Sequence, residues 1–408
     1  MNKKWSKEDN QDKAVKIILF VISPFLSAIY SIRRMNTKSS YRIFFLFAIF
    51  FGMSFTISLD HGFDGSAYRG WFEDYSQTST NFEYVDGLQG FLTFDEGKKD
   101  YYFDTIAFYI SRFTDNYHVM FMFAAIVFAF FALKSLRFLT NEEKFDFSIA
   151  SLILVYIFMQ NDIFNINGLR FWTAAWIGVY SIFQVFRNNN DRYIILIFLT
   201  PFFHGSFWIF IAVILMARFL KKFEKTWVIL FFASFFIGSI ALELLRDASD
   251  ILPAFMQRMI STYTDAEYVE LRTEGGSGFI WVTRLMDFLV RFSINFMVYL
   301  FIRNSKMIKA NSKTRNLYLF ILIWMTFVNF AMPIPSLGNR YFQLAFPIVA
   351  YIWMVNFKDV KYKDFLYVLP FVYWLVFYTQ FTRYSQVLDP RFYISSPFYL
   401  IYKYLIAF

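Results

Sequence analysis

The chain has 408 residues and a formal net charge of +9, and its residues are 57% hydrophobic, 24% aromatic and only 17% charged. Soluble globular chains average about 25% charged residues, so this chain has too few charges to cover a water-facing surface. The composition excludes an ordinary soluble protein, and the lack of Cys excludes disulfides and Cys-ligated metal.

Long apolar segments recur along the whole chain. Because a bilayer-spanning helix needs roughly 20 mainly apolar residues, these segments predict an all-α, polytopic integral membrane protein of about 12 transmembrane helices. Segment 193–219 fits one long helix or two, and the first apolar run lacks a convincing cleavage site and is expected to be an uncleaved anchor. In chain order, the predicted spans are 14–32, 41–59, 117–137, 147–161, 168–187, 193–203, 205–219, 226–245, 281–302, 316–334, 340–356 and 363–381.

Lys and Arg predict how these spans are oriented, because both residues concentrate in cytoplasmic loops. The basic clusters lie in 33–42, 134–144, 187–192, 218–225, 303–315 and 358–363. If these are all cytoplasmic, the extracytoplasmic parts are 60–116, 160–169, the turn around His204, 246–280, 333–339 and the C-terminal segment 382–408. We expect a single membrane domain over 1–408 with a polar N-terminal extension, 1–13. The charge pattern leaves open on which side of the membrane this extension lies. The positive charge is spread over many loops rather than gathered in one stripe, which excludes a nucleic-acid partner.

Ionisable residues gather at the predicted outer ends of the spans, where they are costly and mark function or a buried partner by default. Each has a simpler interpretation: the arginines can extend to lipid headgroups, His204 can bond a helix end, Asp64 can end a turn, and Arg284 can pair with Asp287 on its own helix. Several separate hairpins nevertheless place such residues at the same depth. They are Asp64, Tyr68, Arg69, Arg170, His204, Arg284, Arg291 and Arg340.

This convergence points to a particular chemistry. Arg is suited to bidentate contact with phosphate oxygens, and His is the usual proton acceptor near neutral pH. A site at the outer interface, open sideways to lipid, favours a lipid-linked phosphate substrate.

The motifs that carry these residues resemble those of the EpsG family of Wzy-type polysaccharide polymerases. The resemblance spans roughly 41–357 and rests on Asp64-x-x-x-Tyr68, Asn167-x-x-Arg170, Phe203-His204-x-Ser206 and Arg340-Tyr341-Phe342. One position departs from the family, which often has Gln where this chain has Phe171.

The resemblance implies a multi-pass protein of the bacterial inner (plasma) membrane with a fold like that of the GT-C-like membrane glycosyltransferases. Such a polymerase transfers glycan from undecaprenyl pyrophosphate to the non-reducing end of another lipid-linked repeat unit, building O-antigen, capsule or exopolysaccharide. It uses no cofactor and no metal, and its implied partners are the undecaprenyl-pyrophosphate-linked oligosaccharide, membrane lipid, and a chain-length regulator and flippase of the same pathway.

This transfer needs a base for the attacking hydroxyl and cations for the leaving pyrophosphate. We expect the catalytic residues to be His204, Arg170, Arg340 and Asp64, with His204 and Asp64 competing for the role of base. The expected substrate-binding residues are Arg284, Tyr68, Arg69, Asn167, Arg291 and Tyr341.

Three other functions stay open from the sequence. A lipid-linked oligosaccharide flippase or other transporter would show internal repeats, broken helices and cations near the bilayer midplane. A membrane acyltransferase would use His204 on a glycan hydroxyl, with its donor site toward the cytoplasm. A non-catalytic assembly component needs none of this chemistry.

Overall fold

The computed structural model describes residues 5–59, 63–94, 98–236, 247, 257, 280–358, 362 and 364–407. Over these residues the chain is helical and has no strand, so the predicted all-α fold is confirmed. Most of the predicted loop 246–280 lies outside the described residues.

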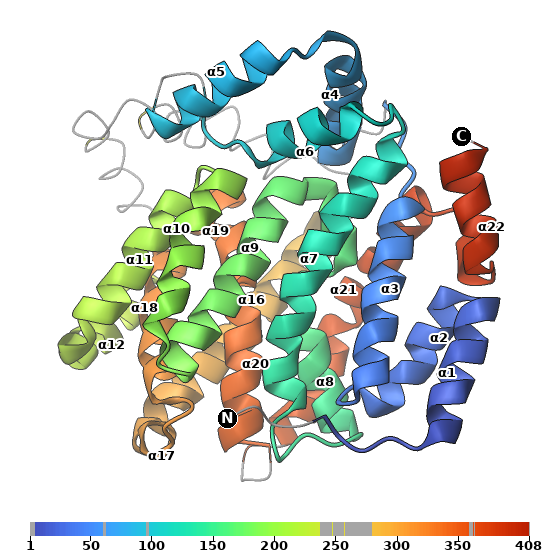
Figure 1. Ribbon diagram of the computed structural model, residues 1–408. Helices are drawn as coiled ribbons and strands as arrows, with labels where there is room; N and C mark the ends of the chain where they lie inside the picture. The colour runs from blue at the N-terminus through green and yellow to red at the C-terminus, as the bar shows by residue number, and fades with distance from the viewer. Residues whose placement is uncertain are drawn as a thin grey trace.

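Two groups of helices make up the fold, a bundle and a layer across one of its ends (Figure 1). We call the layer the cap; it consists of α4 (Asp64–Thr78), α5 (Asn81–Leu92) and α6 (Tyr102–Ser111). The bundle contains α3 (Lys38–Met53), α7 (Tyr117–Thr140), α8 (Ile149–Phe158), α9 (Leu169–Ile182), α10 (Ile194–Phe203), α11 (Phe207–Phe219), α12 (Glu224–Ala233), α16 (Ile280–Arg303), α18 (Arg315–Ala331), α20 (Ala345–Asn356) and α21 (Asp364–Val387). Short helices add to it: α17 (Ser305–Ala310), α19 (Pro335–Gln343) and α22 (Pro397–Ile401).

Four helical segments of the described chain are long and apolar enough to cross a membrane: Tyr117–Thr140, Ile149–Arg187, Trp281–Arg303 and Asp364–Val387. Two shorter apolar helices accompany them, Phe207–Phe219 and Arg315–Ala331. These helices make the chain a membrane protein. The count of about 12 spans stays a prediction, since α8 and α10 have only 10 residues each and a helix of that length covers about half of the hydrocarbon core.

The first predicted span, 14–32, is wrong as a single helix. The chain forms α1 (Asn10–Ile22) and α2 (Pro24–Ser31), which break at Ser23 and pack against one another (Figure 1). Pro24 has no N–H to continue α1 but suits the first position of a new helix, and the Ser23 hydroxyl accepts hydrogen bonds from the N–H groups of Phe25 and Leu26.

The predicted extracytoplasmic segment 60–116 is also more ordered than expected, because its described parts form the three cap helices. Thr80 and Glu83 form a capping box at the start of α5, in which each side chain bonds the other residue's backbone N–H. These helices are amphipathic or polar rather than uniformly apolar, so a search for membrane spans passes over them.

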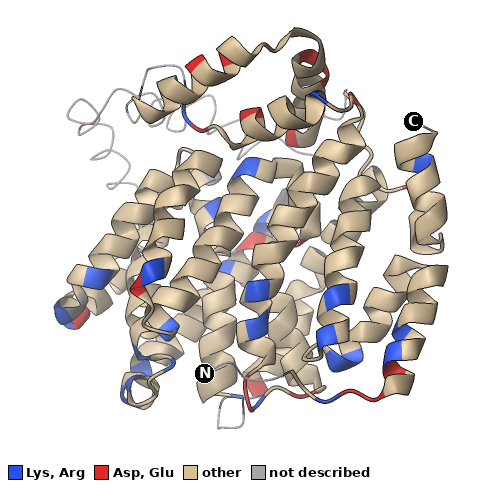
Figure 2. Cartoon of the chain, in the orientation of Figure 1, with Lys and Arg blue, Asp and Glu red and all other residues tan. Residues whose placement is uncertain are grey.

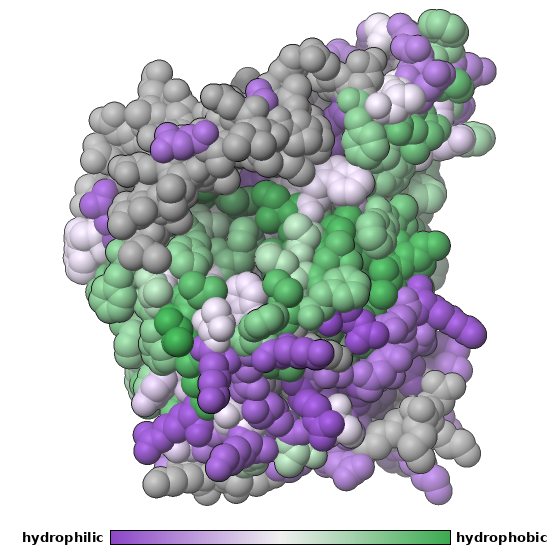
Figure 3. All heavy atoms as spheres, turned by 90° about the vertical axis from the view of Figure 1, so that its left-hand side faces the viewer, coloured by the Kyte–Doolittle hydropathy of each residue, from purple (hydrophilic) through white to green (hydrophobic). Residues whose placement is uncertain are grey.

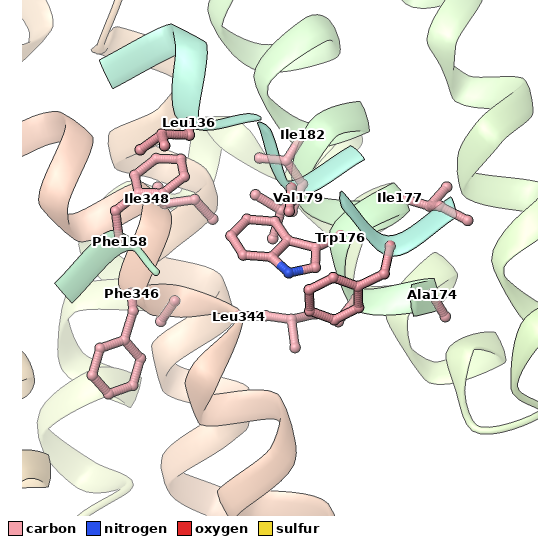
Figure 4. Packing of buried hydrophobic residues seen from close by; sticks show 14 of the residues in the cluster. Leu136, Phe158, Ala174, Trp176, Ile177, Val179, Ile182, Leu344, Phe346 and Ile348 are labelled. Carbon is pink, nitrogen blue, oxygen red and sulfur yellow. The ribbon is translucent and has the colours of Figure 1, made fainter. Parts of the chain in front are cut away.

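Large aromatic side chains fill the centre of the bundle (Figure 4). Trp176 of α9 is fully buried among residues that include Phe158 and Leu344, and its indole N–H donates to the Asn161 carbonyl oxygen at 3.0 Å. Small residues let other helices approach closely: a Cβ on Gly52 of α3 would overlap Ala125 of α7.

The two ends of the bundle differ in charge. Lys and Arg gather at the end opposite the cap, whereas Asp and Glu are prominent on the cap (Figure 2). At the basic end, Glu142 accepts from Arg187 and from Lys313, both at 2.6 Å, and so links separate helices. A hydrophobic belt borders this hydrophilic end (Figure 3).

Candidate active site

A cavity of about 210 Å³ lies where the cap meets the bundle. Four parts of the chain enclose it: α4, the start of α9, the turn between α10 and α11, and α19. Its lining residues are Asp64, Ala67, Tyr68, Trp71, Gly168, Arg170, Phe171, Trp172, His204 and Arg340. The cavity therefore brings together all four residues that the sequence analysis proposed as catalytic, and Tyr68 with them.

Arg170 is held in place by two partners. It sits in the first turn of α9, directly after the 3₁₀ segment η2 (Ile163–Gly168). Its Nε donates to the Tyr68 hydroxyl and its Nη1 to Asp100 Oδ1, both at 2.9 Å. Its guanidinium also lies 6.0 Å from the Trp71 ring centroid. These contacts fix the guanidinium at the cavity wall, with 30% of the side chain still exposed.

Asp100 is the partner that orders this side of the cavity. It is 7% exposed, and its second carboxylate oxygen accepts from the Gly205 N–H at 3.3 Å. One carboxylate thus ties Arg170 to the turn that carries His204. Burial raises the pKa of the Asp100 carboxyl, while Arg170 opposes that shift. Burial likewise raises the pKa of Tyr68, which keeps its phenol neutral.

His204 occupies the turn between α10 and α11, where its backbone N–H closes the last bond of α10 to Thr200. Its Nδ1 lies 2.8 Å from Ser206 Oγ and 3.3 Å from the Ser206 N–H. Burial lowers the pKa of His204 well below its usual value, and Arg170, Arg340 and Lys99 lower it further. The imidazole is therefore neutral near pH 7, the state in which one ring nitrogen keeps its lone pair.

Arg340 faces Asp64 across the cavity, with 3.7 Å between Nη2 and Oδ2. The Arg340 side chain is 31% exposed and Asp64 56% exposed, so solvent weakens this ion pair and a substrate anion could displace the carboxylate. The Arg340 guanidinium also lies 5.4 Å from the Phe171 ring. Phe171 thus gives Arg340 an aromatic face and meets His204 edge-on, with 5.3 Å between ring centroids.

Asn167 and Tyr341 do not line the cavity but hold its walls in place, and their expected role in substrate binding stays a prediction. The Asn167 side-chain oxygen accepts from the Gly65 N–H at 2.9 Å and so anchors the first turn of α4 beside Asp64. Tyr341 is fully buried, and its hydroxyl donates to the Ser206 carbonyl oxygen at 2.7 Å.

Three other expected binding residues lie outside this cavity. Arg69 is engaged by Glu73 Oε1 and the Ile57 carbonyl oxygen, each at 2.7 Å, and stacks on Tyr117. Arg284 is exposed on α16. Arg291, further along α16, donates to Asn339 Oδ1 at 2.5 Å and lines neighbouring cavities. Their expected contact with substrate stays a prediction.

The sequence analysis missed Asp100 and gave Ser206 no role. Asp100 lies in an acid-rich stretch with no periodic pattern, so no local signal distinguishes it. Ser206 stands in the Phe-His-x-Ser motif, and its nearness to His204 was readable from the sequence. Within the described residues, no group of three or more His, Cys, Asp or Glu side chains is arranged to hold a metal ion.

Comparison with known families gives one result. The model of the EpsG family matches residues 42–399, which is most of the chain. No curated protein and no solved structure gives a significant match.

Proposed function

The chain belongs to the EpsG family, and from this we propose that it transfers glycan from undecaprenyl pyrophosphate to the non-reducing end of a second lipid-linked repeat unit. The family suggests a polysaccharide polymerase-like, glycosyltransferase-like role. The observation that carries the proposal is the cavity itself, in which two guanidinium groups and a neutral imidazole meet at one end of an apolar helix bundle.

The charge distribution supports a location of this cavity at the outer face of the bacterial plasma membrane. Lys and Arg gather at the opposite end of the bundle (Figure 2), and such residues concentrate on the cytoplasmic side. The cap end would then face outward, where assembled lipid-linked repeats are joined into O-antigen, capsule or exopolysaccharide.

The proposed reaction is a single displacement. The hydroxyl oxygen of the acceptor sugar forms a bond to the anomeric carbon of the donor, and the bond from that carbon to the pyrophosphate oxygen breaks. Undecaprenyl pyrophosphate leaves with the bond electrons, and Arg170 and Arg340 stabilise the added negative charge. Arg170 is pre-positioned by Tyr68 and Asp100, whereas Arg340 can exchange Asp64 for the pyrophosphate.

His204 is the proposed acceptor of the hydroxyl proton. In the tautomer that carries the proton on Nδ1, this N–H donates to Ser206 Oγ and the Nε2 lone pair is left for the substrate. The Ser206 N–H, 3.3 Å from Nδ1, favours the other tautomer. Asp64 stays the second candidate for the base, because its exposed carboxylate lines the same cavity. The base ends the step protonated and returns the proton to water.

A groove of about 780 Å³ between α12, α16 and α18 is suited to the isoprenoid chain of a substrate. Its walls are mainly aromatic, including Phe232, Phe292 and Phe296, and Arg291 lies among its lining residues. Because Arg291 bonds Asn339, the neighbour of Arg340, the groove leads toward the helix that bears a pyrophosphate-binding arginine.

A lipid-linked oligosaccharide transporter is the second candidate, because Arg291 lies well inside the long apolar helix α16. The test incubates purified protein in nanodiscs with the native lipid-linked repeat unit. A ladder of extended products supports the polymerase. Substrate that binds without extension, together with movement of the same lipid across proteoliposomes, would favour the transporter.

A further inference from the structure

A second cavity, of about 240 Å³, lies among η2, α16, α19, α20 and α21, and the proposed reaction does not use it. Its lining is unusually rich in carboxamides for a helix bundle in a membrane: Gln160, Asn165, Asn339, Gln343 and Gln380. Each carboxamide offers both a donor and an acceptor. In the described chain Gln160 and Asn165 each donate one hydrogen bond, and Asn339 and Gln380 each accept one. The remaining amide groups of this set can bind a polar ligand.

The second cavity shares walls with the first. On α19, Arg340 lines the first cavity, whereas Asn339 and Gln343 line the second. On η2, Gly168 belongs to the first cavity and Asn165 to the second. A molecule reacting in the first cavity therefore has neighbouring units within a short distance of the second.

Charge separates the two cavities chemically. The described lining of the second contains two carboxylates and two guanidinium groups, from Asp162, Asp287, Arg291 and Arg383, which balance one another. The first has two arginines and a single carboxylate in its lining. A pyrophosphate therefore fits the first cavity better, and a neutral ligand with many hydroxyl groups fits the second.

Gln343 carries the most specific signal. Its Oε1 is buried and has no hydrogen-bond partner among the described residues, although the side chain lines the cavity. Buried acceptors are nearly always satisfied in native proteins, so this acceptor is expected to take a donor, and a ligand in the cavity that the Gln343 side chain lines can supply one. Phe342 and Phe346 lie beside it in the same lining and supply the apolar contact that sugar rings favour.

We propose that the second cavity binds an uncharged sugar unit of the lipid-linked glycan, next to the sugar that reacts in the first cavity. The identity of the glycan rests on the proposed function. The carboxamides and carboxylates bond its hydroxyl groups, and Gln343 Oε1 accepts from one of them.

The test measures binding separately from turnover. The probe is the free oligosaccharide released by mild acid from the lipid-linked repeat of the strain that carries this chain, titrated into protein in nanodiscs. Gln343→Leu and the similarly shaped Gln343→Met remove the acceptor, which has no partner in the described protein. The matched control is Ser31→Ala, which removes a different buried polar atom without a described partner, the Ser31 hydroxyl on α2, outside both cavities.

We expect both Gln343 variants to bind the oligosaccharide about three- to tenfold more weakly, as for the loss of one hydrogen bond. Their thermal unfolding should be unchanged or shifted upward, because an unpaired buried acceptor has been removed, and Ser31→Ala should bind like wild type. Affinity for inorganic pyrophosphate should not change. Unchanged oligosaccharide affinity, or a parallel loss of pyrophosphate affinity, would overturn the proposal.

If the proposed polymerase function is wrong, the experiment gives a different result. In that case wild type binds the oligosaccharide, and the Gln343 variants bind it weakly, yet none extends the lipid-linked repeat. If instead wild type and the Gln343 variants extend it with the same KM for the acceptor, the polymerase stands and the sugar site is refuted.

Discussion

Ser206 should control the tautomer of His204, and Ser206→Ala tests this. Two groups of the same residue compete for Nδ1, the hydroxyl at 2.8 Å and the backbone N–H at 3.3 Å. With the hydroxyl present, Nδ1–H can donate to Oγ and Nε2 is free to act as a base. Without it only the N–H remains, which favours a proton on Nε2 and lowers the population of the tautomer with a basic Nε2 lone pair.

Two reference values bound the loss in kcat/KM that we expect for Ser206→Ala. One neutral hydrogen bond is worth about 0.5–1.5 kcal/mol, which corresponds to a loss of about three- to tenfold in kcat/KM. Complete loss of a general base costs about 100- to 10,000-fold, so His204→Ala should be far more damaging than Ser206→Ala. The Tyr341 hydroxyl keeps its bond to the Ser206 carbonyl oxygen, so the turn itself should hold.

The assay follows chain extension by purified protein in nanodiscs, with thermal unfolding measured on the same samples. Ser181→Ala is the matched control, since its buried hydroxyl donates to the Ile177 carbonyl oxygen of its own helix at 2.7 Å. We expect a reduced kcat with little change in KM for Ser206→Ala and normal turnover for the control. Equal kcat in all three proteins would refute the tautomer argument.

Three further results are expected. His204 can act as a base only when it is neutral, and its pKa is lowered by burial and nearby cations. We therefore expect kcat/KM to stay level as the pH falls to about 6.5 and to decline only below that pH. A decline centred above about pH 6.5 would contradict the role of His204 as the base. Gly65→Ala should lower the free energy of unfolding by about 1–3 kcal/mol, because a Cβ at the start of α4 would lie 2.6 Å from Asn167 Oδ1. Gly70→Ala on the same helix should unfold like wild type, since the nearest atom to its Cβ would be 3.7 Å away. Asp100→Ala should lower both kcat and thermal stability, since it leaves Arg170 and the Gly205 N–H without their shared acceptor; a fully active, stable variant would argue against this positioning role.

The main features of the site were predictable because they lie at helix ends. Arg170 starts a helix, and His204 lies at the tip of a short hairpin, so topology alone places both at one end of the bundle. Asp100 could not be found in this way, since only tertiary packing carries its carboxylate to Arg170. Proximity in the fold, rather than any local pattern, gives that residue its importance.

The long helices of the bundle were predicted from the sequence, whereas the helices of the cap were not. Hydropathy finds long apolar helices such as α7, α16 and α21 but responds weakly to the cap, whose stability comes from packing one face of each helix. The capping box at Thr80 and Glu83 was present in the sequence as a helix-start signal. Pro24 likewise marked the break between α1 and α2.

The most direct test of the central claim measures whether Arg170 and Arg340 act on the same pyrophosphate. Chain extension would be compared for wild type, Arg170→Ala, Arg340→Ala and the double variant, with unfolding curves for each. A shared site predicts a severe loss in each single variant and a loss in the double variant smaller than the product of the two, because the charges stabilise one leaving group. Normal ladders from either folded single variant would contradict the account.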